Sequence, residues 1–162
     1  METTIRVRDA DSTDQDLLMS FHQSLYQQHR DRVVPKRDLP LIEYNDYERI
    51  LREDIRALLS DVKSVVLIAE AHGVPVGYVT GRVAVEPQRV LPRRGVVEDW
   101  YVAPESRGAG VGAMLLRELE KRFVASGCQM IESATWSANE SARKAHDALG
   151  FREIRVVYRK PL

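Results

Sequence analysis

The 162-residue chain has very little cysteine, few histidines and no surplus of charge of either sign. Its single cysteine, Cys128, excludes an internal disulfide framework, and its 4 histidines are too scattered for a metal-binding pattern. Lys plus Arg and Asp plus Glu number 24 each, so no overall basic field attracts nucleic acid or an anionic membrane. Neither a signal-peptide pattern nor an apolar run of bilayer length occurs. These absences predict a cytoplasmic protein that binds no metal, nucleic acid or membrane.

Length and composition predict one domain that spans residues 1–162. A chain of this size with 44% hydrophobic residues can bury one substantial core, but it has no room for a second one. Helical and alternating apolar patterns are interspersed, and an early pair of strands joined by a short turn is typical of an antiparallel hairpin. We therefore expect an α/β (α+β) fold in which a single mixed sheet is flanked by helices.

Apolar periodicity and turn-forming residues predict the order of elements along the chain. The first half has a strand around Ile5 and Val7, a helix capped within residues 11–14 and ending near Arg30, a loop over 31–44, and a helix capped by Asn45 or Asp46 that runs to about Ser60. The second half has strands over 65–71 and 76–85, a break over 87–95, a strand over 96–102, a helix over 110–126, a strand over 130–135, a helix over 138–149 and a final strand over 154–158.

A glycine-rich loop lies between a predicted strand and a predicted amphipathic helix. It reads Arg107-Gly108-Ala109-Gly110-Val111-Gly112, so its backbone amides can converge at the helix N-terminus without Cβ atoms in the way. The helix dipole and Arg107 add positive potential, which makes a diphosphate the natural ligand. The alternative interpretation is a tight glycine-rich turn that binds nothing.

Two other phosphate-binding motifs fit this loop less well. A P-loop is excluded because no Gly-Lys-Ser/Thr follows. Gly108-x-Gly110-x-x-Ala113 satisfies the relaxed dinucleotide fingerprint, with Glu132 near the distance of a ribose-binding acid, and this favours a nicotinamide-binding oxidoreductase. However, residues 103–106 separate the strand from the glycines, and too little chain follows for a doubly wound nucleotide domain.

The segment from Glu98 to Gly112 resembles the central motif of the GNAT superfamily of acetyl-CoA-dependent N-acetyltransferases, which runs Arg/Gln-x-x-Gly-x-Gly/Ala. Arg107, Gly110 and Gly112 fill its three positions. The later Asn139-Glu140-Ser141-Ala142, followed by Leu149-Gly150-Phe151, is similar to the second signature of that superfamily. The resemblance implies a splayed sheet and acetyl-CoA as cosubstrate, and it is silent on the acceptor.

The resemblance also implies which residues hold the cofactor. The backbone of Tyr101 and Val102 would pair with the pantetheine amides, as if the cofactor were an extra strand. Asn139 would hydrogen-bond the pantetheine arm, or it would simply cap its helix. The pyrophosphate would lie on Arg107, Gly108, Ala109, Gly110, Val111, Gly112 and Ala113.

Acetyl transfer needs a neutral amine, but an alkylamine has a pKa of about 10.4 and is mostly protonated at neutral pH. Glu98 is the candidate catalytic base, acting directly or through a water, because it lies on the strand beside the expected thioester. In polyamine-type members of the superfamily, a glutamate followed by an aspartate at this place serves the acceptor amine, and the resemblance puts Glu98 there. Strand alternation predicts that Asp99 lies on the opposite face. The alternative is that Glu98 is a strand-edge charge or half of an ion pair.

The departing thiolate needs a proton, and here the sequence differs from the family pattern. Many members carry a tyrosine four residues before the glycine of the second signature, where this chain has His146. His146 is the candidate general acid, since an imidazole with an ordinary pKa of about 6.5 can protonate a thiolate. The alternatives are a structural histidine, a reaction without a dedicated acid, or a phenol from Tyr101 or Tyr158, of which Tyr158 is better explained as a packing residue.

The acceptor is the least defined part of the prediction. We expect transfer of the acetyl group to a primary amine of a small molecule (polyamine-like, amino acid or antibiotic), which attacks the thioester directly in a ternary complex. The alternatives are an acceptor at a protein N-terminus or lysine, and a non-catalytic CoA-binding module. By analogy with the superfamily, in which strands near the C-terminus often pair, we expect a homodimer. An acidic acceptor site would be built from Glu43, Asp46, Glu48, Glu53, Asp54, Glu98 and Asp99, unless these form an ordinary charged helix face.

Overall fold

The computed structural model describes residues 4–162, and its centre is an open five-stranded sheet of order β1-β2-β3-β4-β5. Neighbouring strands within β1 to β4 are antiparallel, whereas β5 runs parallel to β4. This is the mixed sheet that the sequence predicted. The strands are β1 (Ile5–Asp9), β2 (Ser64–Ala71), β3 (Val74–Val85), β4 (Arg93–Val102) and β5 (Met130–Ser133).

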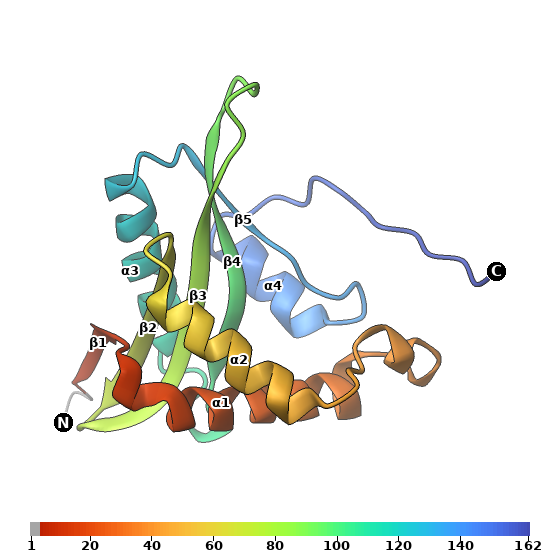
Figure 1. Cartoon of the computed structure of the whole chain (residues 1–162), viewed down its shortest axis with the longest axis horizontal. Coiled ribbons are helices and arrows are strands. Elements are labelled where there is room, and N and C mark those ends of the chain that lie inside the picture. The colour runs from red at the N-terminus through yellow and green to blue at the C-terminus, as the bar shows by residue number, and fades with distance from the viewer. Residues whose placement is uncertain (1–3) are drawn as a thin grey trace.

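Helices cover both faces of the sheet (Figure 1). The amphipathic α1 (Gln15–Gln28) and α2 (Tyr47–Ser60) pack on one face, and α3 (Val111–Ala125) packs on the other. The short α4 (Glu140–Ala148) follows β5. No helix within residues 4–162 combines the length and the apolar character needed to cross a bilayer.

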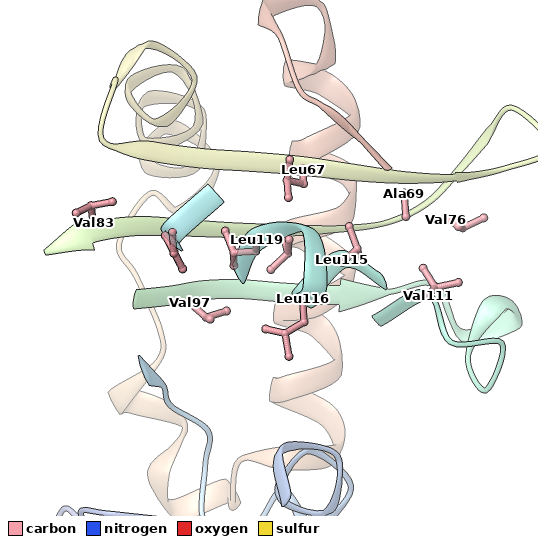
Figure 2. Packing of buried hydrophobic residues seen from close by; sticks show 11 residues of the cluster. Leu67, Ala69, Val76, Val83, Val97, Val111, Leu115, Leu116 and Leu119 are labelled. Carbon is pink, nitrogen blue, oxygen red and sulfur yellow. The ribbon is translucent and has the colours of Figure 1, made fainter. Parts of the chain in front are cut away.

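Each face of the sheet has its own apolar cluster. Figure 2 shows Leu115 and Leu119 of α3 over the strands that carry Leu67 and Val97, and all four side chains are buried. On the other face, Phe21 of α1 stacks on Tyr78, with ring centroids 5.8 Å apart. Because both clusters lie against the same strands, the sheet is a rigid support for the side chains at its edges.

The region between α1 and α2 differs from the predicted loop. It contains a π-helix over His29–Val33 and a 3-10 helix over Lys36–Leu41, with Pro35 between them. Helices this short show no sustained apolar period, which is why the pattern did not reveal them. The predicted start of α2 is confirmed, but Asp46 does not cap it: its backbone is left-handed, and its carboxylate accepts a hydrogen bond from Arg49 Nε at 2.6 Å.

A β-bulge changes the faces of β4. Thr80 pairs with Asp99 and Gly81 pairs with Val97, so Glu98 is an extra residue in β4. The Asp99 amide donates to Thr80 Oγ1 at 3.0 Å, which satisfies an amide at the bulge. Glu98 and Asp99 therefore point into the same cleft, and the prediction that Asp99 lies on the opposite face is wrong.

The strands β4 and β5 separate after a short paired stretch. Pairing begins at Arg94 with Met130 and ends at Val97 with Ser133. Residues 93–95 were predicted as a break, but they belong to β4 because they pair with the end of β3 in the long β3–β4 hairpin. The strand β5 ends two residues before the predicted end at Thr135. Beyond Val97, no strand of residues 4–162 pairs with the β5 side of β4. The sheet is therefore splayed where the resemblance placed the cofactor.

The last predicted strand does not form. Residues 152–162, here called the C-terminal arm, have no regular secondary structure, and all are exposed. Figure 1 shows the arm running past α4 and away from the sheet. The alternating sequence of 154–158 predicts an extended conformation, but a strand also needs a neighbour, and no strand of residues 4–162 pairs with this segment.

Candidate functional site

The glycine loop forms an open N-terminus for α3. Gly108 and Gly110 both have φ of +81°, a left-handed conformation that brings successive amides to one side. Gly110 occupies the N-cap position of the 15-residue α3, whose first turn has neither a side-chain cap nor an acidic residue. Trp100 Nε1 donates to Gly112 O at 3.2 Å and so fixes the loop against β4. These free amides and the helix dipole provide a site for an anion.

Arg107 lies at the end of β4 beside this loop. Its Nε donates to Val102 O at 2.9 Å, and its Nη2 donates to Gln28 Oε1 at 2.7 Å. The guanidinium thus ties α1 to the end of β4 and keeps a positive charge next to the open amides. Nothing in the sequence connected Gln28 with the site, because the two residues are 79 positions apart.

An acidic cleft of about 370 Å³ lies on the α1/α2 face of the sheet. Its wall comes from α1, α2, and the strands β2 to β4, and it reaches β4 where that strand leaves β5. Arg82 is its one Lys or Arg side chain, against four carboxylates. Those carboxylates belong to Asp54, Asp61, Glu98 and Asp99.

Asp99 is the least exposed charged group of the cleft. Its side chain is 31% exposed, and His22 Nε2 lies 3.8 Å from Asp99 Oδ1. The other ring nitrogen of His22, Nδ1, is 2.7 Å from the Tyr47 hydroxyl. Burial raises the pKa of Asp99, while His22 and His29 act in the opposite direction. A carboxylate with a raised pKa is a stronger proton acceptor than an ordinary one.

Glu98 lies nearer the rim. Its carboxylate is 35% exposed and is 3.2 Å from Arg82 Nη2. The structure therefore brings both carboxylates of the bulge to the cleft, with Glu98 in an ion pair and Asp99 beside a histidine. His22 and Tyr47 were not candidate site residues from the sequence, because both lie at the helical spacing of apolar side chains.

His146 lies where β4 and β5 separate. Its Nδ1 is 2.6 Å from Ala142 O, and its Nε2 is 2.6 Å from Ser133 Oγ, at the last paired residue of β5. Since a carbonyl only accepts, Nδ1 carries a proton, and a neutral ring then accepts from the serine hydroxyl at Nε2. The ring also makes T-shaped contacts with Trp100 and Phe151. His146 is thus held in place by contacts at both nitrogens.

Asn139 caps α4, as one of its two predicted roles required. Its Oδ1 accepts from the amide of Ala142 at 3.2 Å, which leaves the Nδ2 donors for another partner. Most of the predicted acidic residues are not brought to the cleft: Asp46 and Glu53 pair with Arg49 on the exposed side of α2, and Glu43 lies 3.5 Å from Arg30.

Several other residues discussed from the sequence lie outside the site. Glu132 pairs with Arg94 at 3.1 Å, and burial raises the pKa of the Cys128 thiol, which suppresses its nucleophilic thiolate. Tyr158 is 89% exposed on the C-terminal arm and packs on nothing, which contradicts its predicted packing role. Within residues 4–162, no three His, Cys, Asp or Glu side chains are grouped as a metal site requires.

Comparison with known proteins gives consistent matches. The model of the Acetyltransferase (GNAT) family matches residues 21–151. An aminoglycoside N(6')-acetyltransferase type 1 from Stenotrophomonas maltophilia is 35% identical over 116 residues, which cover 68% of this chain and 75% of that protein.

Two solved structures are similar in fold. One is the aminoglycoside N-acetyltransferase AAC(6')-Iy in complex with CoA, with a TM-score of 0.79, 21% identity, and coverage of 99% of this chain and 97% of that chain. The other is a predicted acetyltransferase with acetyl-CoA from Clostridium acetobutylicum, with a TM-score of 0.77, 19% identity, and coverage of 98% and 96%.

Proposed function

Because this chain belongs to the GNAT family of acetyl-CoA-dependent N-acetyltransferases, we propose that its acidic cleft receives the acceptor amine and that the acceptor is a polycationic amino sugar of the aminoglycoside type. The observation on which this proposal rests is the position of the cleft. It opens beside Glu98 and Asp99, at the point where β4 leaves β5. The relative in Stenotrophomonas maltophilia, an aminoglycoside acetyltransferase, supports this class of acceptor.

Acetyl-CoA would bind along the free edge of β4. The amides of residues 108–113 and the charge of Arg107 would hold the pyrophosphate, and the backbone of Tyr101 and Val102 would pair with the pantetheine arm. Asn139 Nδ2 would donate to the same arm. Val102 O already accepts from Arg107, so in this arrangement its second lone pair serves the cofactor.

The charge of the cleft explains the preference for a polycation. Asp54 and Asp61 line its wall, where they can hold ammonium groups that do not react. Glu98 and Asp99 would hold the amine that does. We assign proton removal primarily to Asp99, with Glu98 supplying negative charge at the rim, because Glu98 is partly neutralised by Arg82.

The reaction follows from these positions as direct attack in a ternary complex. Asp99 takes the proton of the ammonium, and the amine lone pair then forms a bond to the acetyl carbonyl carbon. A backbone amide near Val102 stabilises the oxyanion of the tetrahedral intermediate. When the intermediate collapses, the carbon–sulfur bond breaks and the nitrogen gives up its second proton. The thiolate takes up a proton, from His146 if that residue is the general acid, and free CoA and the acetylated amine leave.

The first experiment measures free thiol release from acetyl-CoA with a panel of aminoglycosides, polyamines, amino acids and peptides. We expect turnover that depends on an aminoglycoside, with the acetyl group on a primary amine by mass spectrometry. Turnover only with peptides would replace the acceptor class. Acetyl-CoA binding without turnover on any amine would indicate a CoA-binding module, and no acetyl-CoA binding would contradict the cofactor site.

Replacing His146 with glutamine tests the general-acid prediction. If His146 gains a second proton at Nε2 in the ternary complex and passes it directly to the thiolate, His146→Gln should lower kcat by about 100-fold, since general acid catalysis contributes at least that much. The matched control is Ser133→Ala, which removes only the Nε2 partner. A loss of thermal stability in His146→Gln with kcat within about threefold of the parent would assign the residue to structure alone.

We further propose that residues 1–162 act as one domain, in the cytoplasm. The two apolar clusters share the strands β2, β3 and β4, which supports a single cooperative unit. A single unfolding transition, seen at the same denaturant concentration by fluorescence and circular dichroism, is the expected result.

A further inference from the structure

A second, much smaller cavity adjoins the acidic cleft. Its volume is about 10 Å³, against about 370 Å³ for the cleft. Four residues line both spaces, namely His22, Ile55, Leu58 and Asp99. The small cavity therefore lies beside Asp99, where α1 and α2 cover the sheet (Figure 1). A space of this size holds a single water molecule when polar groups line it.

Tyr78 lines this cavity and carries a buried hydroxyl. The residue is 2% exposed, and its Oη makes no hydrogen bond to any of residues 4–162. The ring is fixed between Phe21, which stacks on it, and Tyr101, whose ring centroid is 6.3 Å away. A buried hydroxyl without a partner costs free energy, and buried waters commonly satisfy such groups.

Strand pairing brings two further polar groups to the same cavity. Tyr78 and Thr80 are two residues apart on β3, so their side chains share one face of the sheet, and Asp99 lies opposite Thr80 on β4. Thr80 is 1% exposed, and its Oγ1 accepts from the Asp99 amide at 3.0 Å, which leaves the hydroxyl proton of Thr80 to donate elsewhere. The cavity thus combines two hydroxyl donors on β3 with a carboxylate acceptor on β4.

The protonation states of these groups fit a bridge between them. Burial raises the pKa of Tyr78 well above its usual value, and the nearby charge of Asp99 adds to this rise, so the phenol keeps its proton and can donate it. An ionised carboxylate only accepts. A water that accepts from Tyr78 and Thr80 and donates to Asp99 makes about three hydrogen bonds, the usual number for a buried water.

We propose that this cavity binds one water molecule, which accepts hydrogen bonds from Tyr78 and Thr80 and donates one to Asp99. Tyr78 is then a positioning residue, because it holds the ionised carboxylate toward the acceptor by way of the water. A hydrogen bond to the carboxylate favours its charged form and so opposes the effect of burial. The water site stands without the proposed function, whereas its effect on catalysis rests on the proposed role of Asp99 as the base.

Other titratable groups face Asp99 from the neighbouring elements. They are His22 of α1, His29 of the π-helix, Tyr47 of α2, the ion pair of Arg82 and Glu98 at the rim, and the cleft carboxylates of Asp54 and Asp61. The two histidines lower the pKa of Asp99 when they are protonated. A substitution that removes only the Tyr78 hydroxyl leaves all of these groups in place, so it isolates the contribution of that hydroxyl.

Carboxyl titration by NMR measures this contribution on Asp99 itself. In protein labelled with ¹³C at the aspartate carboxyls, the Asp99 resonance is identified by its loss in Asp99→Asn. We expect Tyr78→Phe to raise the pKa of Asp99 by about one unit, the size expected when a hydrogen bond to a charged group is lost. The matched control Tyr26→Phe removes a hydroxyl of α1 that lines neither space, and it should leave the pKa unchanged. Equal pKa values in the parent and in Tyr78→Phe would overturn the proposal.

A high-resolution crystal structure of the parent locates the water. An ordered water within hydrogen-bond distance of Tyr78 Oη and of a carboxylate oxygen of Asp99 is the expected result, and Tyr78→Phe should lose or displace it. A dry cavity, or a Tyr78 hydroxyl that bonds directly to another protein atom, contradicts the site. This readout depends neither on the acceptor nor on turnover.

Kinetic measurements distinguish a failure of the water site from a failure of the proposed base. The acidic limb of kcat/KM should move to higher pH in Tyr78→Phe by the same amount as the carboxyl titration, because the hydroxyl acts only through Asp99. If the carboxyl pKa rises while the acidic limb stays in place, the water site is supported and Asp99 is not the base. If the limb moves while the carboxyl titration does not, Tyr78 acts on another group and the proposal fails.

Discussion

Replacing Asp99 with asparagine is expected to lower kcat/KM for acetyl transfer by about a hundredfold to ten-thousandfold, the range that a general base contributes. The amide has the same shape as the carboxylate, but it cannot accept the proton of the ammonium. Calorimetric binding of acetyl-CoA should be unchanged, because Asp99 faces the acceptor cleft. Glu98→Gln is the matched control and should cost less than about tenfold. The reverse order of the two effects would restore Glu98 as the base.

The same substitution should change the pH profile. Burial raises the pKa of Asp99 above the ordinary value of 3.8, so the active carboxylate is lost as the pH falls through this raised pKa. His22 and His29 face the carboxylate, and their protonation lowers its pKa, which limits the rise. We expect an acidic limb of kcat/KM in the parent that is absent from the residual activity of Asp99→Asn.

Stability measurements separate this loss of activity from unfolding. A raised pKa means that the folded state favours the protonated carboxyl over the ionised one. At a pH above that pKa the ionised carboxylate therefore destabilises the fold, and a substitution that removes the charge should stabilise it. Asp99→Asn should therefore unfold at a temperature no lower than the parent at neutral pH. A fall of several degrees would mean that the contact between Asp99 and His22 stabilises the fold more than burial of the charge of Asp99 destabilises it.

The face of Asp99 shows what local sequence cannot predict. The segment 96–102 has strand propensity, and a regular alternation places consecutive residues on opposite faces. The bulge that overrides this alternation depends on Thr80, which lies 19 residues away and accepts a hydrogen bond from the backbone amide of Asp99. The acidic pair in the cleft is thus a product of the β3–β4 pairing. The positions of His22 and Tyr47 at the cleft depend likewise on how α1 and α2 pack on the sheet.

The glycine loop was predictable because its signal is local. Strand, loop and helix follow one another within residues 93–125, and the left-handed glycines and the open helix N-terminus belong to that segment alone. The C-terminal arm is the opposite case. Its alternating residues predict an extended conformation, but pairing is a property of two strands, and no strand of residues 4–162 pairs with the arm.

An aspartate in place of Gly110 should abolish most acetyl-CoA binding. Gly110 has φ of +81°, a region that aspartate tolerates better than most residues, so the change mainly adds a negative charge. That charge would lie at the N-terminus of α3, where the amides would hold the pyrophosphate. Repulsion between charges a few ångströms apart near a protein surface is worth about 3 kcal/mol, or roughly a hundredfold in Kd. Calorimetric titration with acetyl-CoA measures it.

Gly73→Asp is the control that isolates the position of the charge. Gly73 lies in the β2–β3 turn with φ of +78°, and a Cβ there, as at Gly110, would meet no atom within 4 Å. Both variants therefore carry the same charge and a similar backbone cost, which should appear as similar shifts in the unfolding midpoint. Only Gly110→Asp should lose affinity for acetyl-CoA, and the loss should shrink at high salt because screening weakens the repulsion. Equal affinities in the two variants would move the pyrophosphate away from the α3 N-terminus.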